Sequence, residues 1–210
     1  MARPPELVQL LAAAWAFFAL VALWLRTRSW GRRVLFAPPA GDGPAGVRYA
    51  FTAGMLPEAK ESVRMHRPSY VAGLVLHAGV FAGFALLVAS VAGASLPAAA
   101  LQGAGTAAAA GALAGLGLLG KRIAKPHLRG LSCPDDFVAN LLTTAFAALS
   151  SAAAFAPAAR TAWLLAASVL LLYVPVGKIR HCLLFFPTRY HMGFFFGRRG
   201  TFPPVPRTDA

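Results

Sequence analysis

Two histidines, His77 and His181, are the residues whose type and position suggest chemistry. Each lies at the same end of an apolar segment long enough to cross a bilayer, where a polar imidazole is costly unless its ring is satisfied. The two segments are predicted to run antiparallel, so that both imidazoles lie at the same depth. Two such imidazoles are typical axial ligands of a b-type haem. An interhelical hydrogen bond of His77 is the alternative.

Three neighbours of these histidines have candidate supporting roles. Gly79 follows His77 by two residues, and its lack of a side chain leaves room for a flat macrocycle or for a packed helix. Lys178 and Arg180 precede His181 and can pair with haem propionates at the membrane surface. They can equally be ordinary basic anchors of a membrane span.

A second candidate pair, His66 and His191, is displaced toward the cytoplasm. Eleven residues of helix from His66 to His77 rise roughly 16 Å and return to nearly the same face. Pro68 and Pro187 interrupt the segments between the histidines, however, and both sites fall outside the apolar runs. We therefore expect one haem, with a second at this pair as the alternative.

The elements that must position these residues are predicted to be membrane-spanning helices. Of the 210 residues, 58% are hydrophobic and 13% are charged, and the mean hydropathy is +0.61. Apolar runs of the length that crosses a bilayer, about 20 residues, lie at about 7–25, 69–93, 97–119, 137–156 and 161–177. We expect an all-α integral membrane bundle of five transmembrane helices, forming a single domain over 1–210. A cytoplasmic linker at 26–54 and a cytoplasmic tail at 188–210 complete it.

The basic residues sort to one side of these spans. Of the 20 Lys and Arg residues, eighteen lie in the segment after span one, the loop after span three and the region after span five, whereas only Arg3 and Arg160 lie on the other side. The positive-inside rule then puts the N-terminus outside and the C-terminus in the cytoplasm. This distribution accounts for the net charge of +13 without a nucleic acid partner.

Several function classes are disfavoured. The sequence has no nucleophile–base arrangement, phosphate loop or zinc spacing, so we do not expect a self-sufficient enzyme. Cys133 and Cys182 lie on the predicted cytoplasmic side and are expected to be free thiols. A small transporter would show mid-span charges and internal repeats, which we do not find.

Three motifs occur in order along the chain: Val75-Leu76-His77-Ala78-Gly79, Ser132-x2-Asp135-Asp136-Phe137 and Pro175-x2-Lys178-x2-His181. Together they resemble the membrane cytochrome b family of the respiratory nitrate reductase gamma subunits, with the related subunits of heterodisulfide-reductase-like and sulfite-reduction complexes. The resemblance implies five spans, an outside N-terminus and haem b ligated by His77 and His181. Family members with two haems carry further histidines where this chain has Leu87 and Trp163, so the resemblance carries over the cytoplasmic-side haem only.

The function implied by this resemblance is electron transfer in the bacterial inner (cytoplasmic) membrane. We expect a haem b subunit of a respiratory oxidoreductase that connects the quinone pool to a cytoplasmic iron–sulfur or molybdenum-type partner. The alternative is a haem-free membrane anchor that tethers a soluble redox partner. The basic cytoplasmic surface around Arg198-Arg199 would dock that partner, although the preceding Phe194-Phe195-Phe196 favours an interfacial helix in the headgroups.

Overall fold

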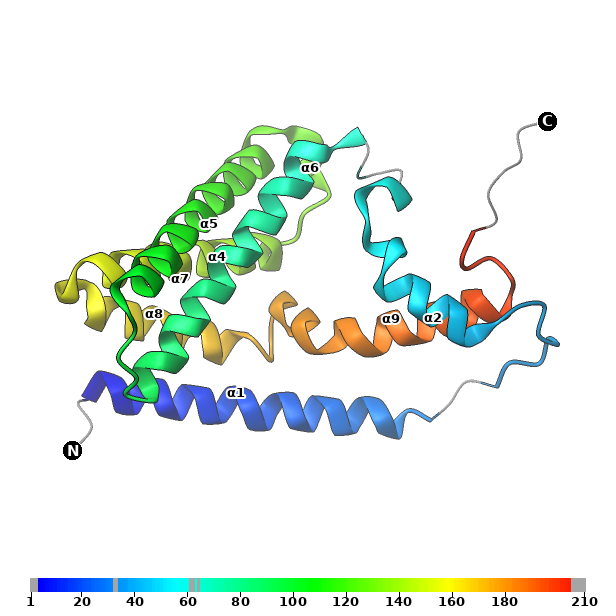
Figure 1. Ribbon diagram of the computed structural model, residues 1–210, viewed down its shortest axis with the longest axis horizontal. Coiled ribbons are helices and arrows are strands. Elements are labelled where there is room, and N and C mark those ends of the chain that lie inside the picture. The colour runs from blue at the N-terminus through cyan, green and yellow to red at the C-terminus, as the bar shows by residue number, and fades with distance from the viewer. Residues whose placement is uncertain (1–3, 32–33, 61–62, 64, 205–210) are drawn as a thin grey trace. The chain divides into compact units, whose positions relative to one another are not determined.

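The computed structural model describes residues 4–31, 34–60, 63 and 65–204. This part of the chain is helical and contains no strand. The α-helices are α1 (Pro4–Ser29), α2 (Gly43–Phe51), α4 (Arg67–Val91), α5 (Ala98–Ala124), α6 (Pro126–Gly130), α7 (Pro134–Phe155), α8 (Arg160–Tyr173) and α9 (His181–Arg198) (Figure 1). Short 3-10 turns lie at Ala53–Met55, Pro57–Ala59, Pro157–Ala159 and Lys178–Arg180.

Four of these helices, α1, α4, α5 and α7, are each long and apolar enough to cross a membrane. A fifth span exists if the segments on either side of the break after α8 are taken together. The prediction of an all-α, multi-pass membrane protein is therefore confirmed. The first four predicted spans match these helices to within a few residues at each end, because long apolar runs leave little choice of structure in lipid. The direction in which they cross stays a prediction.

The fifth predicted span, 161–177, is interrupted. Its helix α8 ends at Tyr173, because Pro175 has no N–H with which to continue the backbone ladder. The N–H groups of Val176 and Gly177 instead donate to the Tyr173 carbonyl, at 3.1 and 2.9 Å. With 14 residues, α8 rises about 21 Å, which is less than the apolar thickness of about 30 Å. It cannot span a bilayer alone.

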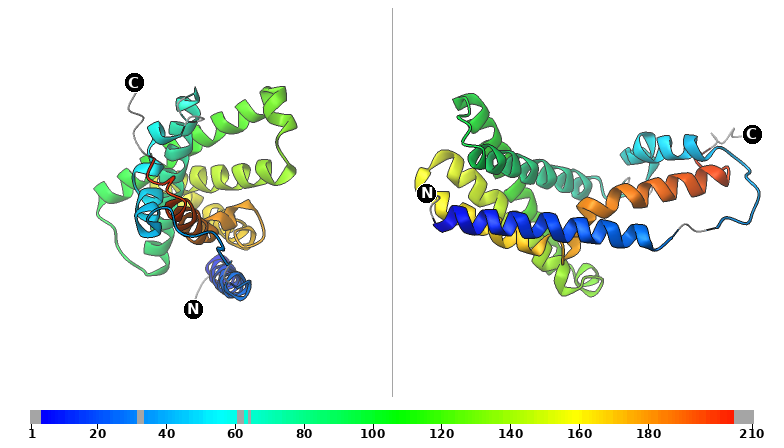
Figure 2. Two further views of the ribbon diagram at one scale, coloured as in Figure 1. Left: turned by 90° about the vertical axis from the view of Figure 1, so that its right-hand side faces the viewer. Right: turned by 90° about the horizontal axis from the view of Figure 1, so that it is seen from below.

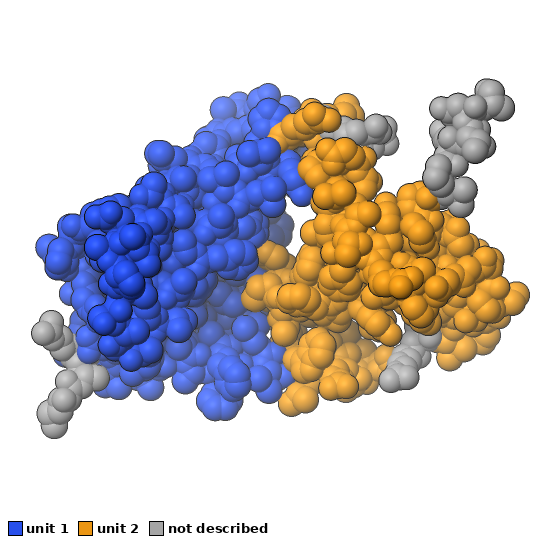
Figure 3. Space-filling model, in the orientation of Figure 1, with its two compact units in different colours: residues 1–21, 68–179 blue, residues 22–67, 180–210 orange. Residues whose placement is uncertain are grey.

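The chain divides into two compact units (Figure 3). Unit 1 comprises residues 1–21 and 68–179, and unit 2 comprises residues 22–67 and 180–210. Unit 1 thus holds most of the apolar helices, whereas unit 2 holds α2, α9, the last turns of α1 from Ala22 onward and the segments that connect these helices.

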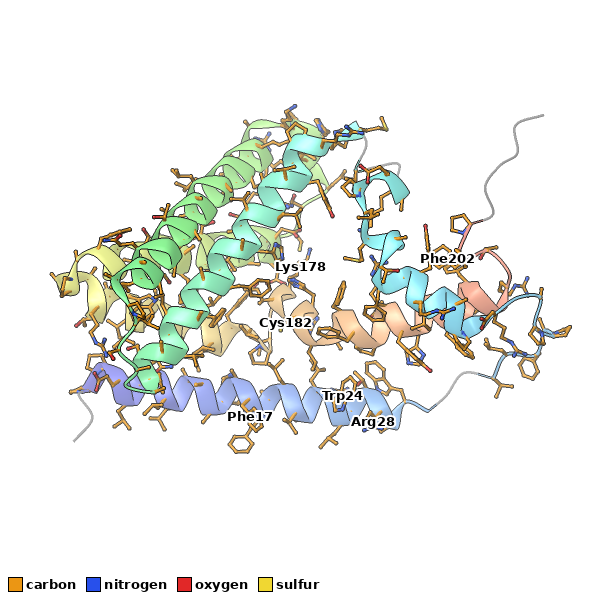
Figure 4. All side chains as sticks on the ribbon, in the orientation of Figure 1. Phe17, Trp24, Arg28, Lys178, Cys182 and Phe202 are labelled. Atoms are coloured by element: carbon orange, nitrogen blue, oxygen red, sulfur yellow. The ribbon has the colours of Figure 1, made fainter. Side chains whose placement is uncertain are left out.

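Unit 1 is organised around an apolar core that α4, α7 and α8 share. Its buried members are Leu86, Leu87, Phe146, Trp163, Leu164, Ala167, Leu170 and Val174. Helix α5 packs along α7, and Gly115 lets it approach Thr144 closely. Helix α1 packs against this core through Leu20, and the Trp15 indole donates a hydrogen bond to the Leu172 carbonyl of α8 at 3.2 Å. Phe17 of α1 is exposed (Figure 4).

Unit 2 is built on the contact of α2 with α9, which lie side by side (Figures 1 and 2). A Cβ added at Gly46 would lie only 2.2 Å from the Gly193 carbonyl oxygen, so the two backbones nearly touch. Helix α2 lies inside the predicted linker 26–54, where the Pro- and Gly-rich sequence indicates only a break. It forms because Pro44 occupies the first turn, where a missing N–H costs nothing. Helix α9 likewise continues into the predicted tail, as far as Arg198.

Candidate functional site

His77 lies in the apolar helix α4 and is exposed. Its Nδ1 atom is 2.7 Å from the carbonyl oxygen of Gly73, one turn earlier in the helix. Because a carbonyl oxygen only accepts, Nδ1 must donate this hydrogen bond, and Nε2 is then the acceptor atom of the neutral ring. The Phe81 ring lies beside the imidazole, with 6.3 Å between centroids. The backbone and a neighbouring ring thus set both the tautomer and the orientation of His77.

The face of α4 that carries His77 is otherwise apolar. Leu74, Phe81 and Val88 share this face at helical spacing and are 54%, 67% and 66% exposed. In a bilayer, side chains of this kind contact acyl chains, another helix or a flat apolar cofactor. An imidazole among them marks a point at which a polar or metal interaction is favoured.

Gly79 belongs to the opposite side of α4, because two residues rotate a helix by about 200°. It is buried, and a Cβ added there would lie 2.7 Å from the Cα of Gly111 and 2.9 Å from the carbonyl oxygen of Ala107, both in α5. Of the two roles that the sequence offers for Gly79, the structure therefore displays helix packing. A haem bound by His77 would lie away from this contact.

Leu87 and Trp163 are both part of the unit 1 core, and each is 4% exposed. The Trp163 indole donates a hydrogen bond to the Ser150 hydroxyl at 2.9 Å, so its polar edge is satisfied within the core. At these two positions, where two-haem cytochromes of the resembled family carry histidines, this chain has packed apolar side chains.

A hollow of about 300 Å³ adjoins Trp163 at the end of the α4, α7 and α8 core. Its walls are mainly apolar, with Ser90 and Arg160 among the lining residues. The Arg160 guanidinium also pairs with Glu6 of α1 at 3.3 Å. The volume is at the lower end of the range of ligand pockets, about 300–1,000 Å³.

A charged cluster at the start of α7, within unit 1, brings together residues of the Ser132-x2-Asp135-Asp136-Phe137 and Pro175-x2-Lys178-x2-His181 motifs. The Asp136 carboxylate lies 2.7 Å from the Lys178 ammonium and 3.8 Å from the Arg122 guanidinium. It also accepts the backbone N–H of Cys133 at 3.0 Å, which caps the helix. Prolines and acids at this position are typical of a helix start, since the N-terminal dipole favours negative charge. Sequence reasoning named Asp136 and Lys178 separately but not their ion pair.

Tyr173 connects the non-helical segment after α8 to the same charged cluster. Its ring covers Gly177, where an added Cβ would lie only 2.1 Å from the ring. Its hydroxyl donates to Asp135, both to the carboxylate and to the carbonyl oxygen at 3.2 Å. The break is thereby fixed to α7, and Lys178 takes a defined position three residues before His181 (Figure 4).

The remaining predicted ligands lie in unit 2. His181 is the first residue of α9, and both it and Arg180 are exposed. His77 and His181 belong to different units, so their pairing stays a prediction, as do the propionate contacts of Lys178 and Arg180.

The second candidate pair lies within unit 2. His66 and His191 are both exposed, and the His191 ring lies 5.5 Å from that of Tyr190. Among the described residues, no hydrogen bond or ring contact joins His66 to His191. Nothing in the structure therefore strengthens the prediction of a second haem there.

The chain matches no family model, no curated protein and no solved structure.

Proposed function

We propose that this protein is a haem b-containing membrane subunit of a respiratory oxidoreductase, similar to the gamma subunit of respiratory nitrate reductases. It would transfer electrons between the quinone pool and a cytoplasmic iron–sulfur or molybdenum-type partner. The observation that supports the proposal most is the setting of His77, in an apolar helix with Nδ1 oriented by the Gly73 carbonyl at 2.7 Å. Metal-ligating histidines usually donate their second ring N–H to a backbone carbonyl or carboxylate in this way.

In this proposal, His77 and His181 hold the iron through their imidazoles. When bound, the haem supplies one-electron chemistry at a potential set by its ligands and by the burial around them. The chain's own residues keep the His77 ring in one tautomer, exclude water with the apolar face of α4, and place Lys178 before the second ligand. The ion pair of Lys178 with Asp136 fixes this ammonium to the start of α7.

The core of unit 1 favours one haem over two. Leu87 and Trp163 cannot ligate iron, and both are packed against other buried side chains. The hollow beside Trp163 is our candidate for quinone contact, because its apolar walls and its Arg160 and Ser90 groups suit a quinone ring.

The test is a reduced-minus-oxidised absorbance spectrum of the purified protein, with haem and protein quantified on one sample. We expect a low-spin b-type signal at one haem per chain. His77→Gly should remove the signal while the protein still inserts, and added imidazole should restore part of it because the free base fills the vacated position. His127→Gly is the matched control, since His127 is exposed on the short helix α6, and should leave the spectrum unchanged.

Two results would overturn this reasoning. An unchanged spectrum in His77→Gly would rule out His77 as a ligand, and loss of half the haem in His66→Gly would establish a second site at His66 and His191. Wild-type protein without haem, from cells well supplied with it, would favour the haem-free anchor.

A further inference from the structure

We propose that unit 2 carries a binding surface for anionic phospholipid headgroups. The surface consists of Val34, Phe36, Phe195, Arg198 and Arg199, which line a hollow of about 260 Å³ where the loop before α2 meets the end of α9. We call it the aromatic–arginine surface. It combines exposed apolar side chains with two guanidinium groups in one place.

The loop side of this surface is held by hydrogen bonds to the last turn of α9. The Arg198 guanidinium donates to the Ala37 carbonyl at 3.0 Å. The Arg198 carbonyl in turn accepts the N–H groups of Ala40 and Gly41, at 2.9 and 3.1 Å. The apolar loop residues and the arginines are thus held together by the fold, and their proximity does not depend on a ligand.

The apolar side chains of the surface are highly exposed, which is unfavourable in water. Phe36 is 93% exposed, Val34 is 66% exposed and Phe195 is 40% exposed. Phenylalanine rings beside arginines are well suited to the boundary between headgroups and acyl chains, where the ring leaves water and the guanidinium stays at the phosphates. The two kinds of side chain therefore indicate one environment.

Unit 2 carries an excess of positive charge, which favours an anionic binding partner. Its residues include thirteen Lys and Arg but only four Asp and Glu, counted over the whole sequence of the unit. All three ion pairs that join described residues lie in unit 1 instead. Anionic lipids at a membrane surface attract basic residues by roughly a factor of five in affinity for each one.

The short segment between the end of α1 and Val34 favours the membrane surface over a distant partner. Helix α1 ends at Ser29, and its 26 residues rise about 39 Å, more than the apolar thickness of about 30 Å, so its end reaches the headgroup layer. Val34 follows five residues later and can therefore lie at most about 18 Å away. The aromatic–arginine surface is thereby kept within reach of the headgroups.

The experiment uses the full chain in nanodiscs, with Cys133 and Cys182 replaced by Ser. A bimane fluorophore on Val34→Cys reports on the surface, and one on Val88→Cys, which is equally exposed on α4 at 66%, is the control. Each label is measured in mixed phosphatidylglycerol and phosphatidylcholine, with bromine on the acyl chains of one lipid or the other. In equimolar mixtures we expect phosphatidylglycerol to occupy position 34 at least about fivefold more often than phosphatidylcholine does, and the two lipids to occupy position 88 equally.

Charge variants test the arginines directly. Arg199→Gln should lower the preference at position 34 about fivefold, whereas Arg199→Lys should keep it, because the charge and not the fork geometry attracts the headgroup. Arg129→Gln removes the same charge from the short helix α6 of unit 1 and should have no effect. Equal quenching by both brominated lipids at position 34 would overturn the proposal. So would the absence of quenching by either, which would assign the surface to a protein partner.

Discussion

Replacing Gly79 by alanine tests how α4 meets α5 beside the candidate ligand. The added Cβ would lie 2.7 Å from the Cα of Gly111, whereas carbon atoms in contact are about 3.5–4.0 Å apart. The neighbouring atoms are backbone, so no side chain can rotate away, and the helices must separate by about 1 Å. Overpacking of this kind costs about 1–3 kcal/mol.

Gly73→Ala is the matched control on the same helix. A Cβ there meets nothing within 4 Å, and the carbonyl that accepts from His77 is unchanged. Both substitutions gain the same helix propensity, about 1 kcal/mol, so this contribution cancels in the comparison. The difference between the two variants in free energy of unfolding is then the overpacking cost, about 2 kcal/mol or roughly 30-fold in the equilibrium constant.

The assay is unfolding of the purified protein in mixed micelles by increasing dodecyl sulfate, followed by circular dichroism. Equal stability of Gly79→Ala and Gly73→Ala would refute the α4–α5 contact described here. The haem spectrum adds a second readout. If Gly79 packs against α5, the band position stays unchanged in Gly79→Ala, whereas a shifted band would indicate that the glycine borders the macrocycle.

Three further predictions use the same unfolding assay. Trp163→Ala should cost about 3–5 kcal/mol, because it removes a buried ring from the core, and a cost below 1 kcal/mol would contradict that burial. Tyr173→Phe should cost about 1 kcal/mol through loss of its hydrogen bond to Asp135, and no cost would mean that the break is held in another way. Burial and the nearby Arg189 charge lower the pKa of Lys60 in the folded protein. Between that lowered pKa and 10.5, the unfolded chain therefore binds more protons than the folded chain, and the free energy of unfolding rises with pH in this range. Lys60→Gln should therefore raise the free energy of unfolding of unit 2 at neutral pH, and this increase should shrink as the pH approaches 10.5. An increase that does not change with pH would exclude titration of Lys60 as its cause.

The membrane-spanning helices were the part of the fold that the sequence could predict. Runs such as 69–93 are apolar throughout, and in lipid only a helix satisfies all their backbone groups. Helix α2 escaped prediction because its stability depends on α9: Gly43 and Gly46 weaken an isolated helix but allow a backbone contact that the local sequence does not reveal. The end of α8 at Tyr173 was signalled by Pro175, although the apolar residues around that proline indicated a continuous span.

At the candidate site, the sequence indicated residue types and the structure added their partners. An intramembrane histidine stands out in any apolar run, so His77 was found directly. Its hydrogen bond to Gly73 follows from helix geometry, because a side chain reaches the carbonyl four residues earlier. The pairing of Asp136 with Lys178 joins residues 42 positions apart, and only the packing of α7 with the end of α8 brings them together.

The division of residue types between the units explains why the two proposals can be tested separately. Apolar helices fill unit 1, where the low dielectric makes each polar group costly unless it has a partner, and His77, Trp163 and Tyr173 each have a hydrogen-bonding partner there. Unit 2 concentrates arginine, which the headgroup region tolerates at little cost. A haem lost with His77 should therefore leave the lipid preference at Val34 intact, and Arg199→Gln should weaken that preference without changing the haem spectrum. If either substitution changed both properties, the aromatic–arginine surface and the histidine site would be coupled through α9, because this helix begins at His181 and ends beside Arg199.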